Sequence, residues 1–320
     1  MADEQDPQAC CMPSRPTTPT CCAHQSAMPT KPTAPADRKG MRYLEGGTFR
    51  MGCDHGTYPN DGEGPVREVT LAPFYIDVCA VTNRQFDKFV KATGYKTEAE
   101  KFGWSFVFHL LVPPETAKRI EKKVQGLDWW WKVPGASWRN PEGLTSNIRD
   151  RMDHPAIHIS WNDAIAYCAW SGKRLPTEAE YEFAARGGLD QKEYAWGDEL
   201  MPDGEHRCNI WQGQFPTVNT AEDGYIGLAP ARSFKPNGFG LFNMAGNCWE
   251  WCADWWSRDF HVNGPRTDPK GPPEGTERIM RGGSYLCHVS YCNRYRVSAR
   301  SKNTPDSSTG NLGFRCAANP

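Results

Sequence analysis

The sequence predicts a loop-rich globular domain of mixed helices and strands behind an N-terminal tail. Aromatic residues make up 12% of the 320 positions and include 13 Trp, while 30 Gly and 26 Pro supply turns. This composition favours a fold held by aromatic packing over a helical bundle. A charged fraction of 23% and a hydrophobic fraction of 38% suit a soluble protein, and no apolar run approaches the ~18–20 residues of a membrane span.

Residues 1–40 are expected to be a disordered tail, and residues 41–320 the folded domain. The tail is rich in Pro, Thr and Cys and has almost no bulky apolar residue, so it cannot bury enough surface to order itself. It lacks the apolar core of a secretory signal. We therefore expect a cytoplasmic protein whose 13 cysteines are mostly free thiols or metal ligands.

Turn residues and helix-capping residues along the domain predict its helices and strands. Gly46-Gly47 separates two short apolar runs, 41–45 and 48–52, and favours a β-hairpin. Apolar spacing and capping residues predict three helices, over 83–92, 160–172 and 177–187. A weaker apolar pattern predicts a fourth helix over 115–125. After Gly188 the pattern predicts short strands and long turns.

The formal net charge of −1 gives no reason to expect binding to nucleic acid or to an anionic membrane. A monomer is expected. Glycine pairs match no phosphate-binding loop, and no nucleophile elbow is present.

Cys287 and Cys292 form the pair with the most informative chemistry. Five residues apart, they would point away from each other on a helix, so a shared site requires a loop. No third Cys or His follows at zinc-finger spacing, and soft thiolates favour Cu(I). Three nearby cations favour thiolate over thiol: Arg294, Arg296 and Arg300. A local disulfide or two small buried hydrophobic side chains is the alternative interpretation.

Two later segments offer oxygen ligands for a hard cation. Segment 208–225 contains Asn209 and Asp223, and segment 238–256 has polar side chains around Gly246, namely Asn243, Asn247 and Glu250. Local Asx turns are the alternative at such positions, and the Trp residues of the second segment are more typical of a core.

Taken together, four segments resemble the formylglycine-generating enzymes of the sulfatase-modifying factor family. The most specific is GGSYLCHVSYCNRYRVSARSKNTPDSSTGNLGFRCA, residues 282–317. The others are GKRLPTEAEYEFAARGG (172–188), NIWQGQFP (209–216) and NMAGNCWEWCADWW (243–256). The resemblance covers roughly residues 40–318, and it favours a paired role for the two cysteines over the alternative above.

This resemblance implies an α+β, C-type-lectin-like fold with little regular secondary structure and long, ion-stabilised loops. It also implies oxidation, with copper and O₂, of a cysteine within a Cys-x-Pro-x-Arg motif of an unfolded or nascent sulfatase to Cα-formylglycine. By residue match, Cys287 and Cys292 would bind Cu(I). Positions expected to orient oxygen or the substrate thiol are Ser284, Tyr291 and Asn311, with Trp249 bordering the pocket.

Two structural Ca²⁺ sites are implied as well. The first would use Asn209, Ile210, Asp223 and Tyr225. The second would use Asn243, Gly246, Cys248 and Glu250. Cys168 and Cys316 match a disulfide of the family, with a reduced pair as the alternative in a cytosolic protein.

The chain also departs from the family pattern. Two acidic positions that hold the substrate arginine in the animal enzymes are Ala80 and Trp104 here, although Ser105 is kept. Trp104 is expected to stack on the guanidinium instead. A second disulfide of the animal enzymes has no partners, because Ala185 and Val297 occupy those places.

The tail itself contains a Cys-x-Pro-x-Arg motif, which begins at Cys11 and ends at Arg15. One hypothesis is that this motif is an intramolecular substrate or a pseudosubstrate, and a chance match is the alternative. The pairs Cys10-Cys11 and Cys21-Cys22 suggest a copper-collecting arm, against the simpler interpretation as exposed thiols.

Two other functions compete with the copper oxidase. A non-catalytic ligand-binding module of the same fold would have no reason to keep both Cys287 and Cys292. An iron sulfoxide synthase would need a separate His-rich bundle, which eight scattered His do not supply.

Overall fold

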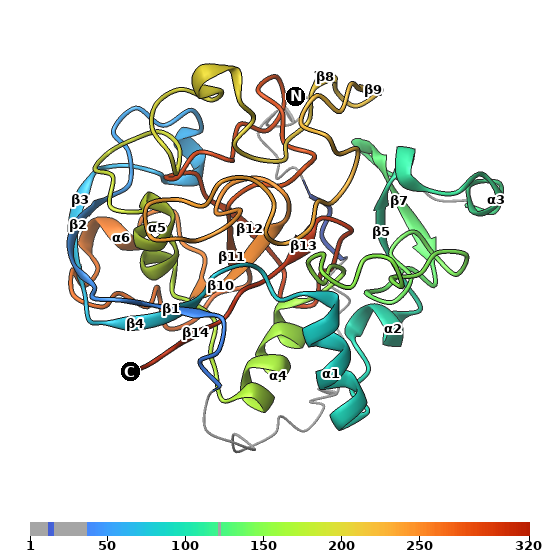
Figure 1. Cartoon of the computed structure of the whole chain (residues 1–320), viewed down its shortest axis with the longest axis horizontal. Coiled ribbons are helices and arrows are strands. Elements are labelled where there is room, and N and C mark those ends of the chain that lie inside the picture. The colour runs from blue at the N-terminus through green and yellow to red at the C-terminus, as the bar shows by residue number, and fades with distance from the viewer. Residues whose placement is uncertain (1–11, 16–36, 121–122) are drawn as a thin grey trace, which may run out of the picture.

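The computed structural model describes residues 12–15, 37–120 and 123–320. They form a mixed fold of small sheets, short helices and long loops (Figure 1). The helices are α1 Asn83–Thr93, α2 Glu98–Phe102, α3 Pro114–Ala117, α4 Trp161–Ser171, α5 Glu178–Arg186 and α6 Phe260–Asn263.

The central sheet has the strand order β12-β11-β10-β13 and lies in the middle of Figure 1. Its strands are β10 Trp249–Trp255, β11 Arg278–Arg281, β12 Ser301–Asn303 and β13 Leu312–Gly313. β10 runs antiparallel to β11 and parallel to β13. Trp249, Trp251 and Met280 on this sheet are buried in the main core, together with Cys287 and Cys292.

Smaller sheets flank the central one. A three-stranded sheet has the order β1-β4-β14, with β1 Met41–Leu44, β4 Phe74–Asp77 and β14 Ala317–Ala318. The pair of β2 Gly47–Met51 and β3 Arg67–Leu71 lies on one side of the molecule in Figure 1. On the other side lies the β5-β7-β6 sheet, made of Trp104–Phe108, Leu127–Pro134 and Lys123–Val124; a last pair joins β8 Gly213–Gln214 to β9 Val218–Asn219.

The three well-punctuated helix predictions are confirmed by α1, α4 and α5. Each begins at a capping box in which the N-cap hydroxyl accepts from the backbone N–H three residues on: Thr82, Ser160 and Thr177. Each ends at a glycine in the left-handed region, where a side chain would be strained. The same signal was present at Thr97 and Glu100, which cap the unpredicted helix α2.

Two element predictions are wrong. The expected hairpin over 41–52 forms both strands, but β1 pairs with β4 and β2 pairs with β3. A Cβ at Gly46 would lie 2.3 Å from the Leu71 carbonyl oxygen, so the Gly46-Gly47 turn passes the chain tightly from one sheet to the other. The expected helix over 115–125 ends at Ala117, because the chain continues into β6, which pairs with β7.

The tail and the predicted disulfide also differ in part from expectation. Met12 and Arg15 are buried against the domain, so these positions of the tail are not disordered; Cys10, Cys11, Cys21 and Cys22 lie outside the described residues. The Sγ atoms of Cys168 and Cys316 are 3.6 Å apart, well beyond the ~2.05 Å of a disulfide, so the two are neighbouring thiols. None of the described helices is long and apolar enough to span a membrane.

Candidate functional site

Two turns bring Cys287 and Cys292 together. The backbone N–H of Cys287 donates to the Ser284 carbonyl across 2.9 Å, and that of Cys292 donates to the His288 carbonyl across 2.7 Å. The two Sγ atoms lie 3.1 Å apart, and each residue is at most 1% exposed. The loop geometry that the five-residue spacing requires is therefore present.

These two sulfurs are a donor pair that suits a soft ion. Their separation exceeds the ~2.05 Å of a disulfide, and both are counted among the thiols of the described chain. The described residues contain no group of three or more His, Cys, Asp or Glu arranged around one point, which a structural zinc site would need. Two thiolates alone fit Cu(I).

Ser284 and Asn311 form a fixed polar pair beside the cysteines. Asn311 Nδ2 donates to Ser284 Oγ across 2.8 Å, and Asn311 Oδ1 accepts from Thr309 Oγ1 across 2.7 Å. The Ser284 backbone N–H donates to Cys287 Sγ across 3.3 Å. All of these side chains are at most 1% exposed, so the relay from Thr309 to the cysteine pair is shielded from water.

Aromatic rings close the pocket over the pair. The rings of Phe215 and Tyr291 stack with centroids 4.5 Å apart, and Trp129 meets Tyr291 edge-on at 5.0 Å. The pocket is lined by Trp129, Trp130, Phe215, Ser284, Leu286, Cys287, Tyr291 and Asn311. Trp129 and Trp130 were not predicted, although the WWW run in a strand pattern could have suggested an aromatic wall.

Trp249 lies in the core beside this pocket without lining it. Its backbone N–H donates to the Asn311 carbonyl across 2.8 Å. Its indole Nε1 is buried and has no hydrogen-bond partner among the described residues. Trp249 therefore lies behind the residues that line the pocket, and not at the pocket's border as predicted.

Backbone hydrogen bonds join the other sequence motifs to the cysteine loop. Trp211 N–H donates to the Cys287 carbonyl across 3.0 Å, and Tyr285 N–H donates to the Asn247 carbonyl across 3.0 Å. The segments 209–216 and 243–256 thus support the cysteine loop directly.

The three arginines near the pair were expected to stabilise thiolates, and this is wrong for two of them. Arg296 and Arg300 form buried ion pairs with Glu63 and Glu178, so their charge is already balanced. Arg294 pairs with Asp61 at 2.6 Å, yet its Nη1 also lies 4.0 Å from Cys292 Sγ. Of these three arginines, Arg294 is the one close enough to Cys292 to favour its thiolate form.

The first predicted calcium set has the features of a cation site. Asn209 Oδ1 is buried without a hydrogen-bond partner in the described chain. Gln212 Nε2 donates both to the Ile210 carbonyl and to Asp223 Oδ2, so the oxygens of two predicted ligands already converge on one neutral amide donor. Burial raises the pKa of Asp223, as expected for a carboxylate without a full counter-charge. Tyr225 is tied in through its N–H, which donates to Asp223 Oδ1.

The second predicted set fits calcium less well. Both oxygens of Glu250 are engaged by Arg315, at 2.5 and 2.7 Å. Asn243 Oδ1 is buried and has no partner among the described residues, and the Arg315 guanidinium also reaches toward the Asn243 carbonyl. The arginine therefore supplies the positive charge here. Gly246 and Cys248 lie between these groups in sequence.

The predicted substrate-binding residues Trp104 and Ser105 lie on β5, where the buried side chain of Arg15 packs among Phe102, Trp104 and Ser308. The surface that these three residues form around the arginine is called the groove below. The Arg15 guanidinium carbon lies 4.1 Å from the ring centroids of both Phe102 and Trp104. Ser105 is buried behind them, and its Oγ contacts Ser308 Oγ at 2.9 Å and His158 Nδ1 at 2.8 Å. Sequence reasoning assigned no role to His158, because its partner Ser105 lies 53 positions away in the chain.

The remaining substituted positions are apolar. Ala80 packs with Ile157 and Cys248. Ala185 and Val297 lie in one buried cluster, so apolar packing stands where the resemblance implied the place of a second disulfide in the animal enzymes.

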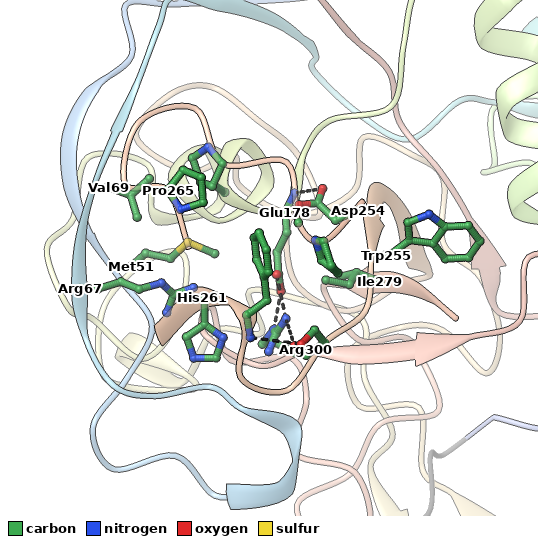
Figure 2. A pocket seen from close by; sticks show the side chains of 16 residues that line it. Met51, Arg67, Val69, Glu178, Asp254, Trp255, His261, Pro265, Ile279 and Arg300 are labelled. Atoms are coloured by element: carbon green, nitrogen blue, oxygen red, sulfur yellow. Dashed lines mark hydrogen bonds and ion pairs between the residues drawn. The ribbon is translucent and has the colours of Figure 1, made fainter. Parts of the chain in front are cut away.

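A separate small pocket lies where α5 faces β10 and β11 (Figure 2). Its charged groups bond to one another: Arg300 pairs with Glu178, and the Glu178 N–H donates to Asp254. It offers about 30 Å³, room for a water or two but not for a peptide. We assign it a structural role.

Known proteins resemble this chain along nearly its whole length. A family model described as "Sulfatase-modifying factor enzyme 1-like domain" matches residues 25–320. A protein of Thermomonospora curvata named "Formylglycine-generating enzyme" is 62% identical over 286 residues, covering 88% of this chain and 94% of its own. A Bos taurus protein named "Inactive C-alpha-formylglycine-generating enzyme 2" is 47% identical, with 87% of each chain covered. Among solved structures, PvdO from Pseudomonas aeruginosa aligns with a TM-score of 0.62 at 25% identity, covering 88% of this chain and 94% of its own.

Proposed function

This chain belongs to the sulfatase-modifying factor family, and from that membership we propose that it matures sulfatases by oxidising a cysteine to Cα-formylglycine. The finer proposal is that the cysteine lies in a Cys-x-Pro-x-Arg motif of an unfolded sulfatase chain. Copper, held by Cys287 and Cys292, and O₂ would serve the oxidation.

The observation that carries this proposal is the 3.1 Å separation of the two buried sulfurs. A binding module has no need of two adjoining thiols under an aromatic wall, whereas a soft metal does. Cu(I) bound there would supply the one-electron chemistry that activates O₂.

The chain's own residues would prepare the site in three ways. The Phe215, Tyr291 and Trp129 rings keep water from the sulfurs. Ser284, held by Asn311, can direct its hydroxyl proton to oxygen or to the substrate sulfur. Arg294, 4.0 Å from Cys292 Sγ, favours the thiolate form that a metal requires.

The overall reaction breaks the substrate Cβ–S bond and forms a carbonyl. R–CH₂–SH, O₂ and two molecules of an external thiol give R–CHO, H₂S, H₂O and one disulfide. O₂ accepts four electrons, two from the substrate cysteine and two from the external thiol, and is reduced to two waters. One water then hydrolyses the substrate thioaldehyde to the aldehyde and H₂S.

We also propose that a structural Ca²⁺ binds at Asn209, Ile210, Asp223 and Tyr225. The unpartnered Asn209 oxygen and the raised pKa of the Asp223 carboxyl, caused by its burial, support this. The second set is the weaker candidate, since Arg315 already balances Glu250.

The test uses the full chain loaded with Cu(I) and a short Cys-x-Pro-x-Arg peptide in aerated buffer containing a thiol. We expect the peptide to lose the mass difference between CH₂SH and CHO and to react with an aldehyde trap. Cys287→Ser and Cys292→Ser should abolish both conversion and Cu(I) binding. Cys252→Ser, a buried thiol of another cluster, is the matched control and should retain both.

Other outcomes would contradict the proposal. Conversion that survives loss of either cysteine would rule out the pair as the metal ligands. Absence of both Cu(I) binding and conversion in the wild-type chain would favour a non-catalytic module, as the name of the bovine relative indicates for that protein.

A further inference from the structure

We propose that the Met12–Arg15 segment is an intramolecular ligand of the substrate groove, so that each molecule carries its own competitor for substrate. This inference rests on the proposed function for the meaning of the groove. The docking itself rests on contacts between four tail residues and residues of the domain more than 80 positions away.

Arg15 is the anchor of the segment. It is 3% exposed, and its guanidinium carbon lies 4.1 Å from the centroids of Phe102 and Trp104. A cation held between two aromatic rings and removed from water is a strong form of this contact. The two rings therefore provide a site for a planar cation.

Hydrogen bonds fix the orientation of that cation. Arg15 Nη2 donates to the Trp104 carbonyl at 3.0 Å and to Ser308 Oγ at 3.1 Å, and Nε donates to the Asp306 carbonyl at 3.1 Å. Carbonyl and hydroxyl oxygens thus hold the arginine, and no carboxylate of the described residues bonds to it directly. Burial lowers the pKa of Arg15 to about 10, so it stays protonated at neutral pH.

The backbone before Arg15 is held as an extended peptide would be. Arg15 N–H donates to Ser307 Oγ at 2.8 Å, and the Pro13 carbonyl accepts from Asn303 Nδ2 at 3.2 Å. Ser14 Oγ donates to Asn303 Oδ1 at 2.8 Å. The Asn303 amide thus bonds both to the backbone at Pro13 and to the side chain at position 14.

The segment also runs toward the cysteine pair. Met12 is 2% exposed, and its Sδ lies 3.5 Å from Thr309 Oγ1. Thr309 bonds to Asn311, and Asn311 bonds to Ser284 beside Cys287. A continuous series of contacts therefore links the docked segment to the pocket.

The tail motif repeats the proposed substrate motif at each fixed position: Cys11, Pro13 and Arg15. Cys11 lies outside the described residues, and the inference does not depend on its position. Residues 16–36 could span up to about 70 Å when extended, so docking within one molecule is sterically accessible.

Tethering makes even weak docking effective. A segment with a dissociation constant of about 0.1 mM would be about 90% docked at an effective concentration of about 1 mM. An external peptide would then bind about tenfold more weakly than it binds a chain with an empty groove.

The test measures the anisotropy of a labelled, unreactive peptide, Ser-x-Pro-x-Arg, with the full-length chain. We expect Arg15→Ala to bind it about tenfold more tightly than the wild type. Lys31→Ala changes a cation of the same tail outside the motif and should leave the affinity unchanged. Equal affinities for Arg15→Ala and wild type would overturn the inference.

Hydrogen exchange of the Arg15 amide gives a readout independent of catalysis. We expect slow exchange in the wild type at every protein concentration and fast exchange once excess peptide is added. An otherwise identical peptide with Ala for its Arg should not speed exchange. Fast exchange without peptide, or protection that grows with protein concentration, would contradict docking within one molecule.

These readouts separate the two proposals. Peptide conversion with a rapidly exchanging Arg15 amide would overturn the tail inference alone. A protected amide with no conversion would overturn the proposed oxidase while the docking stands.

Discussion

Asn311 donates a hydrogen bond from Nδ2 to Ser284 Oγ across 2.8 Å, and the Leu286 N–H donates to the same oxygen across 3.3 Å. A serine hydroxyl has two acceptor sites and one proton. With both acceptor sites used, the Ser284 proton is directed to a third partner, and Cys287 lies in the same turn.

The first prediction follows from that proton. Ser284→Ala should lower kcat for peptide conversion roughly 10²-fold, the usual scale for a positioned proton donor, with little change in KM. Single-turnover kinetics with Cu(I)-loaded protein would measure it. Ser137→Ala, a buried serine outside the pocket, should keep the wild-type rate. An unchanged kcat in Ser284→Ala would show that the hydroxyl takes no part.

Much of this architecture could be predicted from local signals. The starts of α1, α4 and α5 depend on capping boxes that span four residues. The pairing of β1 with β4 could not be foreseen in this way, because the partners are separated by some thirty residues and the glycine pair between β1 and β2 suggested the nearer partner.

The candidate site likewise combines features that local sequence predicts with features that depend on distant residues. The cysteine pair was expected, and the structure brings its sulfurs together. The Arg15 contacts with Trp104 and Ser307 join positions 89 and 292 apart, so no local pattern could place them. The carboxylates that neutralise Arg296 and Arg300 are equally remote, which is why sequence proximity overstated the positive charge around the thiols.

The second prediction concerns pH and His158. This ring is fully buried between Ser105 and the Pro141 carbonyl, and burial lowers the pKa of His158 to about 4. Between pH ~6.5, the unfolded value, and pH 4 only the unfolded chain gains the proton. The contribution of the neutral His158 ring to the free energy of unfolding is therefore complete above pH ~6.5 and is lost as the pH falls toward 4.

His158→Asn removes this titration and suits the left-handed backbone, since φ is 58°. The unfolding free energy of wild type minus that of His158→Asn should fall by about 3 kcal/mol from pH 6.5 to pH 4. Urea unfolding across this range would measure it. A difference that stays constant across this pH range for His158→Asn would refute the prediction.

The third prediction concerns the buried ion network of Figure 2. Figure 2 shows the pair of Glu178 with Arg300, in which Glu178 accepts at 2.6 Å. Glu178 also accepts from Arg281 at 2.9 Å, and all three side chains are at most 8% exposed. Glu178→Gln would leave Arg300 without its counter-charge, while Arg281 would keep only its ion pair with Glu182. We expect a loss of about 3–5 kcal/mol in the free energy of unfolding, measured by urea denaturation.

The matched control is an exposed pair. Asp190→Asn breaks the ion pair between Arg50 and Asp190, whose side chains are 52% and 61% exposed. It should change the free energy of unfolding much less than Glu178→Gln does, because water screens an exposed pair. Equal losses for the two variants would mean that the buried network adds nothing beyond a surface pair.

The last prediction concerns removal of calcium. If Ca²⁺ binds at Asp223 and Asn209, a chelator should lower the melting temperature of the wild type. A cation at a hundredfold excess over its Kd contributes about 2.7 kcal/mol. Asp223→Asn should lose most of the chelator effect, whereas the neighbouring, exposed Glu222→Gln should keep it.

Calorimetric titration with Ca²⁺ would give the affinity directly. Burial raises the pKa of Asp223, and a protonated carboxyl cannot bind Ca²⁺ well. The affinity should therefore fall as the pH is lowered, and this pH dependence should be absent in Asp223→Asn. A chelator effect that Asp223→Asn leaves intact would place the ion elsewhere, with the Asn243 and Glu250 set as the next candidate, even though Arg315 already balances its carboxylate.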